Sequence, residues 1–127
     1  MIFGIGTDIV RVKRIEQSLK RHGDDYAQEI LSDSEYTRYL KTQHKANFVA
    51  KRFAAKEAFV KALGTGFHGP AVLKNISVRN DSVGKPILEF SRDLHAFLDH
   101  LRIQGKYVSI SDDKDIATAF VVLEITK

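Results

Sequence analysis

The sequence contains no cysteine and no tryptophan, and only two of its 127 residues are proline. Without cysteine the chain has no disulfide, no thiolate nucleophile and no zinc–thiolate site, a composition that suits a reducing compartment. It has no apolar run approaching the roughly 20 residues of a membrane span, and its N-terminus lacks the basic and apolar regions of a signal peptide. We therefore expect a cytoplasmic protein.

Internal repeats, low-complexity stretches and linkers are also absent. A chain of this length is predicted to form one domain, residues 1–127, that buries roughly two-thirds of its unfolded surface. Its formal net charge of +4 predicts an acidic partner, which is nucleic acid, a phosphorylated ligand or an acidic protein. Basic residues are dispersed among acidic ones and form no arginine-rich tail, which disfavours a dedicated nucleic-acid-binding protein.

Residues 47–66 are the most informative segment, because alanines and long side chains without internal glycine or proline favour a helix. Asn47 is expected to cap its start, and Gly64 to end it in a left-handed conformation. At roughly 100° per residue, one face is bulky and includes Arg52 and Lys56, whereas the opposite face is mostly alanine.

Glu57 and Lys61 rise from this alanine face. Small residues on an outer helix face indicate that another backbone or a ligand approaches closely. The simplest alternative is an exposed i, i+4 salt bridge between the two side chains, which contributes only about 0.3–0.5 kcal/mol to stability. Their spacing alone does not decide between the two interpretations.

Residues 2–10 alternate as a strand that places Gly4, Gly6 and Asp8 on one face. Glycines inside a strand commonly mark the close approach of another backbone or of a ligand. Asp8 follows the two glycines on this face of the strand. A single acidic residue at the end of a strand is also typical of a helix cap or turn.

The remaining segments predict short helices and antiparallel strands. Ser32 and Glu35 form a capping box, and Gly105 is expected to stop the last helix. Helices are expected at residues 12–22, 26–31, 32–40 and 91–104, and strands at residues 76–79, 86–90, 106–111 and 116–125. The predicted fold class is α+β, a small and mostly antiparallel sheet packed on helices, one of them long and central.

The predicted helix at residues 12–22 has a basic outer face that includes Arg14 and Arg21. Such a face is either ordinary solvated surface or a docking surface for an acidic partner. The sequence of this helix alone leaves both interpretations open.

Two motifs together resemble the 4′-phosphopantetheinyl transferases. They are residues 4–10, reading GIGTDIV, and residues 53–61, reading FAAKEAFVK. The short length, the GTG at residues 64–66 and the final strands are similar to the small bacterial holo-acyl-carrier-protein synthases. The resemblance extends over nearly the whole chain.

The resemblance implies a magnesium-dependent transfer of phosphopantetheine from coenzyme A to a serine of apo acyl carrier protein, releasing adenosine 3′,5′-bisphosphate. This reaction serves fatty acid biosynthesis and lipid metabolism. Asp8 and Glu57 would be the magnesium ligands, and Lys61 would contact the phosphates. The chemistry agrees, because Mg²⁺ is typically held by one or two carboxylates, waters and substrate phosphates. We expect the alanine face beside the glycine stripe to leave room for a pyrophosphate between Asp8 and Glu57.

The resemblance further implies a homotrimer whose sites lie at subunit boundaries, with neither nucleic acid nor membrane as a partner. Arg14 and Arg21 would receive the acidic carrier protein, on a surface distant from the Asp8–Glu57 site. The residues expected to hold coenzyme A are Arg52, Lys56, Lys61, Gly64, Gly66, Gly84, Lys85 and Pro86.

The sequence departs from the family pattern at two positions. Val10 stands where larger relatives carry a further acid, and Asp112 follows the SIS of residues 109–111 where many small relatives carry histidine. Two other functions use the same features. A basic nucleic-acid-binding module explains the charge but gives Asp8 and Glu57 no role, and a magnesium-dependent phosphohydrolase uses both carboxylates with water as the nucleophile.

Overall fold

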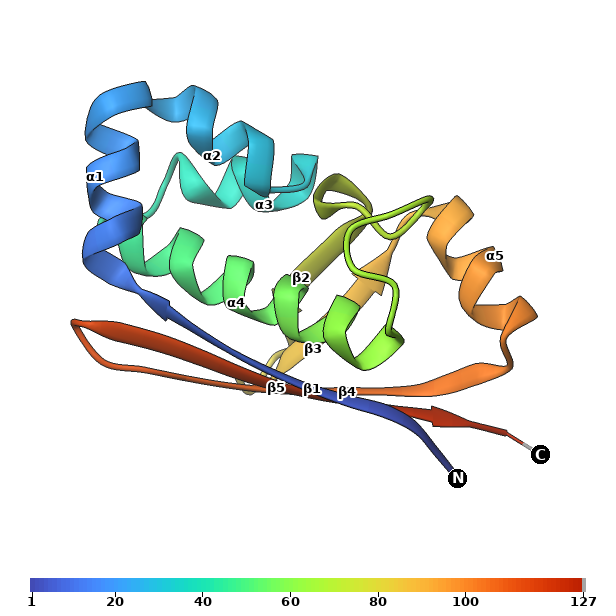
Figure 1. The fold of residues 1–127 in the computed structure, drawn as a ribbon. Coiled ribbons are helices and arrows are strands. Elements are labelled where there is room, and N and C mark those ends of the chain that lie inside the picture. Colours follow the sequence, from blue (N-terminus) through green and yellow to red (C-terminus); the bar gives the residue numbers. More distant parts are fainter. Residues whose placement is uncertain (127) are drawn as a thin grey trace.

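Five α-helices and two antiparallel sheets make up the described part of the chain, residues 1–126, in a computed structural model (Figure 1). The helices are α1 (Val12–His22), α2 (Asp24–Ile30), α3 (Asp33–Tyr39), α4 (Lys45–Leu63) and α5 (Arg92–His100), and η1 (Leu73–Asn75) is a 3₁₀ turn. The strands are β1 (Ile2–Arg11), β2 (Ile76–Asn80), β3 (Pro86–Phe90), β4 (Ile103–Asp112) and β5 (Ile116–Ile125). The predicted α+β class is confirmed.

The larger sheet has the strand order β1-β5-β4, and all its helices lie on one face (Figure 1). The long helix α4 packs directly on this face, which we call the inner face. Its partners include Ala119, Val121 and Leu123, all buried. The opposite face, which we call the outer face, carries no element of the described chain. No helix among the described residues is both long and apolar enough to cross a membrane.

Helix α4 and strand β1 are in backbone contact. A Cβ atom added at Gly6 would lie 2.0 Å from the carbonyl oxygen of Ala58, and one at Gly4 would lie 2.0 Å from that of Ala62. The glycine stripe therefore admits another backbone, as one alternative predicted. The helix backbone fills the space over the two glycines, so the expected room for a pyrophosphate lies beyond them, toward Asp8 and Glu57.

The predicted helix ends are partly confirmed. Ser32 and Glu35 make the complete capping box at the start of α3, and Gly64 ends α4 with a left-handed φ of 85°. Asn47 does not cap α4, which begins two residues earlier after His44. Lys45 and Ala46 extend the helix, and the Asn47 amide instead donates to the carbonyl oxygen of Asp113 at 3.2 Å.

Helix α5 is shorter than predicted. It ends at His100, Arg102 adopts a left-handed φ of 63°, and β4 begins at Ile103. Ile103 is fully buried and pairs with Ile125 of β5, so strand pairing and burial override local helix propensity here. Gly105 consequently lies in a strand and does not stop the helix.

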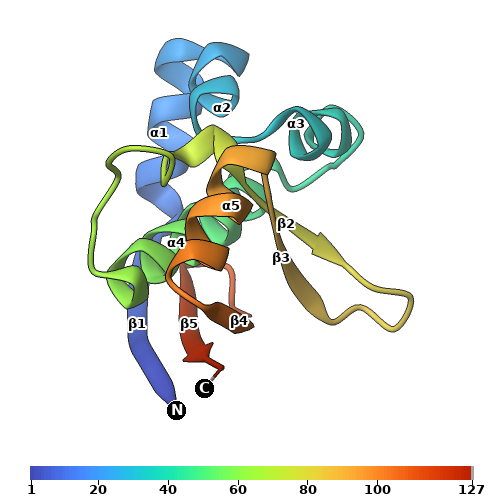
Figure 2. The same cartoon turned by 90° about the vertical axis from the view of Figure 1, so that its right-hand side faces the viewer.

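Strands β2 and β3 form a separate two-stranded hairpin that projects away from the larger sheet (Figure 2). Buried Ile76 and Leu88 anchor its base, and the Phe90 ring lies 4.9 Å from that of Phe59 in α4. The tip, residues 81–85, is ordered by Asp81, whose Oδ1 accepts the N–H groups of Val83 and Lys85. These bonds lower the pKa of Asp81.

Candidate active site

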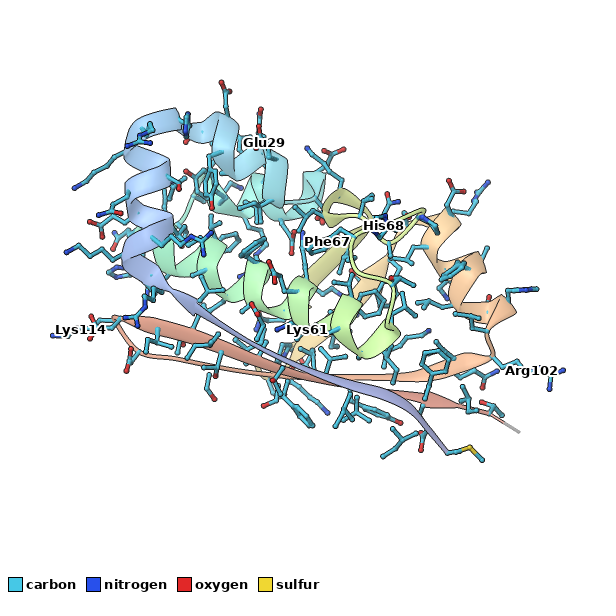
Figure 3. All side chains as sticks on the ribbon, in the orientation of Figure 1. Glu29, Lys61, Phe67, His68, Arg102 and Lys114 are labelled. Carbon is cyan, nitrogen blue, oxygen red and sulfur yellow. The ribbon has the colours of Figure 1, made fainter. Side chains whose placement is uncertain are left out.

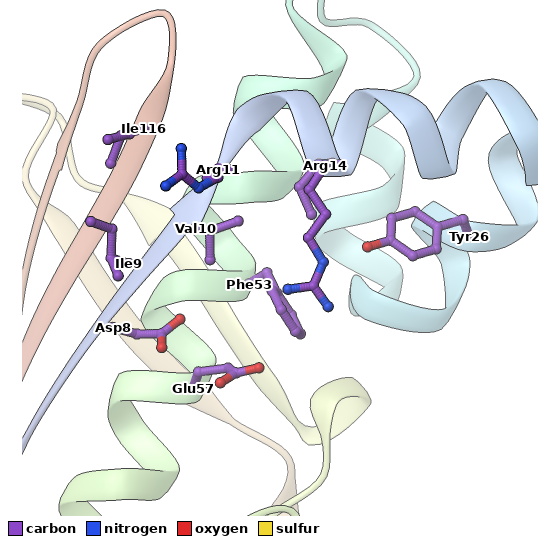
Figure 4. A pocket seen from close by; sticks show the side chains of 10 residues that line it. Asp8, Ile9, Val10, Arg11, Arg14, Tyr26, Phe53, Glu57 and Ile116 are labelled. Atoms are coloured by element: carbon purple, nitrogen blue, oxygen red, sulfur yellow. The ribbon is translucent and has the colours of Figure 1, made fainter.

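Strand β1 and helix α4 bring two acidic side chains to one cavity. Asp8 and Glu57 line a cavity of about 350 Å³ between α4 and α1 (Figure 4). The pairing follows from the backbone contact described above, because Asp8 lies two residues beyond Gly6 and Glu57 immediately precedes Ala58. Burial and the neighbouring charge of Asp8 raise the pKa of Glu57, although Lys61 and Arg14 act in the opposite direction.

Lys61 pairs with Asp8 and not with Glu57. Its ammonium group donates to Asp8 Oδ1 at 3.1 Å and to the Thr7 carbonyl oxygen at 2.9 Å. Within residues 1–126 there is no Glu57–Lys61 ion pair shorter than 4 Å, so the structure does not show the simple i, i+4 salt bridge. Lys61 bridges α4 and β1 (Figure 3), and its side chain remains 54% exposed. The ammonium group is therefore accessible to an anionic ligand.

The donor set suits a hard cation that keeps part of its hydration. The described residues contain no group of three or more histidine, cysteine or acidic side chains arranged to hold a metal. Two carboxylates without nitrogen or sulfur ligands fit Mg²⁺, which usually retains waters and completes its coordination with phosphate oxygens. They do not provide the four protein ligands of a closed structural zinc site.

Arg14 belongs to the same cavity, contrary to the expectation of a surface distant from the acidic pair. Its guanidinium group points toward Phe53 and the Glu57 end of the cavity (Figure 4). Arg21 lies two helical turns further along α1 and does not line the cavity. The helix orientation explains the difference, because α1 begins directly after β1 and its first turn stands beside Asp8.

Arg52 and Lys56 do not reach this cavity. Lys56 is fully buried and donates to Glu35 Oε1 at 2.6 Å, and Arg52 is 5% exposed with its guanidinium group stacked on the Phe48 ring. The expected contact of Lys56 with coenzyme A is therefore wrong for this structure, because its amine has no exposed surface for a ligand. Desolvation lowers the pKa of Lys56 and brings that of Arg52 to about 10, while Glu35 acts in the opposite direction on both.

The remaining predicted contacts lie apart from the acidic pair. Gly64 and Gly66 follow α4 with left-handed φ values of 85° and 65°. Gly84 is at the hairpin tip, and Lys85 and Pro86 line a second cavity, of about 710 Å³, between the hairpin and strand β4. Within a single chain, the second cavity and the Asp8–Glu57 cavity are therefore separate.

Tyr26 and Phe53 line the acidic cavity but were not predicted as site residues. For Phe53 a signal exists in the sequence, because it precedes Glu57 and Lys61 at steps of four residues on one stripe of α4. For Tyr26 no local signal exists, because its position depends on how α2 folds back on α1.

Comparisons with known proteins agree on one family. A family described as the 4′-phosphopantetheinyl transferase superfamily matches residues 4–121. The holo-[acyl-carrier-protein] synthase of Thiobacillus denitrificans is 49% identical over 124 residues, covering 98% of this chain and 95% of that protein. The crystal structure of the holo-[acyl-carrier-protein] synthase from Neisseria meningitidis superimposes with a TM-score of 0.95 at 43% identity, covering 98% and 99% of the two chains. The Bacillus anthracis synthase in complex with CoA (3′,5′-ADP) gives 0.84 at 40% identity, covering 99% of each chain.

Proposed function

The chain belongs to the 4′-phosphopantetheinyl transferase superfamily, and we propose that it is a holo-acyl-carrier-protein synthase. It transfers phosphopantetheine from coenzyme A to a serine of apo acyl carrier protein in a Mg²⁺-dependent reaction that releases adenosine 3′,5′-bisphosphate. The product serves fatty acid biosynthesis in the cytoplasm. The observation that carries the proposal is the meeting of Asp8 and Glu57 at one cavity, with Lys61 bonded to Asp8 across the β1–α4 contact.

Asp8 and Glu57 would hold the magnesium ion, which when bound supplies positive charge to the pyrophosphate of coenzyme A. Lys61 provides a second positive charge, held beside Asp8 by its bonds to the Asp8 carboxylate and the Thr7 carbonyl oxygen. Preorganised charges of this kind are effective in phosphoryl transfer, because the transition state distributes negative charge over the phosphate oxygens. Arg14 adds a third positive charge on the α1 side of the same cavity.

The outer face supports the proposal of a homotrimer. Four large apolar side chains are exposed on it, namely Ile5 (59%), Ile9 (64%), Tyr107 (56%) and Phe120 (41%). A contiguous exposed apolar surface of this kind is typical of a protein–protein interface. Tyr107 and Phe120 of this face also line the second cavity, so coenzyme A contacts from Lys85 and Pro86 would lie beside a subunit boundary. Sedimentation equilibrium measures this assembly directly.

The carrier protein is proposed to bind at α1. Arg21 is exposed on the helix surface and Arg14 lies at the entrance to the acidic cavity. An acidic carrier helix lying along α1 would meet Arg21 first, and its serine would approach Asp8 and Glu57 past Arg14. Gly64 and Gly66 are proposed to lie near the phosphates of coenzyme A.

The decisive experiment incubates the protein with Mg²⁺, coenzyme A and apo acyl carrier protein, and weighs the carrier by mass spectrometry. A gain of one phosphopantetheine group is expected with the wild type, and none with Asp8→Ala or Glu57→Ala. Asp99→Ala is a matched control, because Asp99 is an exposed acid on α5 whose ion-pair partner is His95. Cleavage of coenzyme A without a change in the carrier would instead identify a phosphohydrolase.

A further inference from the structure

A single buried carboxylate, that of Glu35, connects three parts of the molecule. Glu35 is 1% exposed, and its Oε1 accepts the Ser32 N–H at 2.9 Å and the Lys56 ammonium at 2.6 Å. Its Oε2 accepts the backbone N–H of Val78 at 2.8 Å and lies 3.7 Å from Arg52 Nε. The capping box accounts for the first of these contacts only.

The ammonium group of Lys56 extends the same network. It also donates to the carbonyl oxygens of Ile30 at 2.7 Å and Leu73 at 3.1 Å, which lie at the end of α2 and in η1. Lys56 immediately precedes Glu57, and neighbouring helical residues point roughly 100° apart. One turn of α4 therefore directs Lys56 into the buried network and Glu57 into the acidic cavity.

Val78 belongs to β2, the first strand of the projecting hairpin. This hairpin has no strand pairing with the larger sheet, so contacts at its base set its orientation relative to α4. Glu35 binds one of its backbone N–H groups, and the Ser77 hydroxyl adds a bond of 2.7 Å to the hydroxyl of Ser32. The far end of the hairpin carries Lys85 and Pro86, which line the second cavity.

We propose that Glu35 is a positioning residue, which fixes the hairpin and its Lys85–Pro86 loop relative to the Asp8–Glu57 pair. An apolar residue of similar volume often stabilises a core as well as a buried ion pair does. Hydrogen bonds differ from apolar contacts because they have direction, so this network fixes the orientation of β2 in addition to filling space. The proposal rests on the proposed function, in which the hairpin loop contacts coenzyme A.

The Glu35→Gln substitution separates the two roles of this side chain. The amide oxygen of glutamine still accepts from Ser32 and Lys56, so the helix cap is kept. Its NH₂ group then faces the Val78 N–H, and two donors cannot bond to each other. The hairpin hydrogen bond is therefore lost and the buried Val78 N–H is left without an acceptor. The buried Lys56 and Arg52 also lose their countercharge, a general destabilisation that requires a destabilised variant as control.

The experiment measures kcat and KM for coenzyme A, together with hydrogen exchange of the hairpin amides. Glu35→Gln is expected to raise the KM for coenzyme A about tenfold, the effect of one unpaired buried donor, while kcat changes less. Val78 and the hairpin amides should exchange faster while α4 is unchanged. Ser91→Ala is the matched control, since it removes the N-cap of α5 and destabilises the protein without touching Glu35.

An unchanged KM in Glu35→Gln, with a loss of stability similar to that of Ser91→Ala, would overturn the proposal. If Glu35→Gln does not fold, Ser77→Ala provides the test. It removes the neighbouring hairpin contact and is expected to raise the same KM by a smaller factor, and an unchanged value would again overturn it. Absence of transfer by the wild type would instead refute the proposed function. The hairpin exchange rates of Glu35→Gln would still test the positioning role.

Discussion

Gly6→Ala is expected to disrupt the acidic site without altering any of its side chains. The new methyl group would lie 2.0 Å from the Ala58 carbonyl oxygen and 2.7 Å from the Ala62 nitrogen, both backbone atoms of α4. Ordinary contact begins at 3.4 Å, so α4 and β1 must separate by roughly 1.4 Å (3.4 − 2.0). Overpacking of this kind costs about 1–3 kcal/mol of stability. The same movement separates Glu57 from Asp8, and a misplacement of about 1 Å at a catalytic site lowers activity by about 10².

The assay measures kcat/KM for carrier modification well below the melting temperature, so that loss of activity is not loss of folded protein. Gly105→Ala is the control, because its methyl group would meet the side chains of Glu124 and Tyr107 at 2.8–2.9 Å and no backbone atom of α4. This variant should lose stability but keep activity within a few-fold of the wild type. A Gly6→Ala enzyme with near-wild-type kcat/KM would refute the reasoning that backbone contact sets the carboxylate spacing.

Three further predictions concern charge. Lys56→Met should lower the free energy of unfolding in urea by about 3 kcal/mol, because Glu35 remains buried without its closest cation; a loss below about 1 kcal/mol would contradict a buried ion pair. Glu57→Gln should be inactive yet melt at a higher temperature than the wild type at neutral pH without Mg²⁺. The raised pKa of Glu57 means that its contribution to stability is present below pH 4.5, its ordinary pKa, and is lost as pH rises through the raised value. The difference should therefore vanish in acid, and an equal difference at both pH values would contradict this reasoning. Arg21→Glu should slow carrier association in a salt-dependent way with little change in kcat, whereas Arg14→Glu should lower kcat as well; identical kinetic effects would show that both act only in docking.

The sequence predicts that something packs closely against β1 and against α4. It does not predict that these two elements pack against each other. Glycine on one element and alanine on the other each indicate that something approaches closely. Neither pattern distinguishes a backbone from a ligand, because both require the same absence of side chains. The structure resolves the alternatives, because a Cβ atom added at Gly4 or Gly6 would lie only 2.0 Å from a carbonyl oxygen of α4, and the room for a ligand lies in the cavity lined by Asp8 and Glu57.

Long-range ion pairs were the part that sequence patterns did not reveal. Lys56 lies within the bulky arc of α4, where a lysine is either buried with a partner or exposed to a ligand. Its partner Glu35 is 21 residues away in the sequence. The capping box at the start of α3 is sufficient to explain a glutamate at that position. The Val78 N–H that completes the network is a backbone group, which no side-chain pattern can identify. The local capping role of Glu35 is evident in the sequence, whereas its long-range role depends on the fold.

Uncharged backbone contacts between β1 and α4 hold the acidic site together, and the Lys61–Asp8 ion pair adds to them. Burial, and after it the neighbouring charge of Asp8, raises the pKa of Glu57, so the proximity of the two carboxylates has to be imposed by the rest of the fold. Gly6 and Ala58 impose it because nothing but backbone separates the two elements at this point. Lys61 offsets part of the repulsion by pairing with Asp8 while leaving Glu57 unpaired. Under the proposed function, a divalent cation held by these carboxylates would offset the remaining repulsion, so the packing that destabilises the unliganded protein would favour the binding of Mg²⁺.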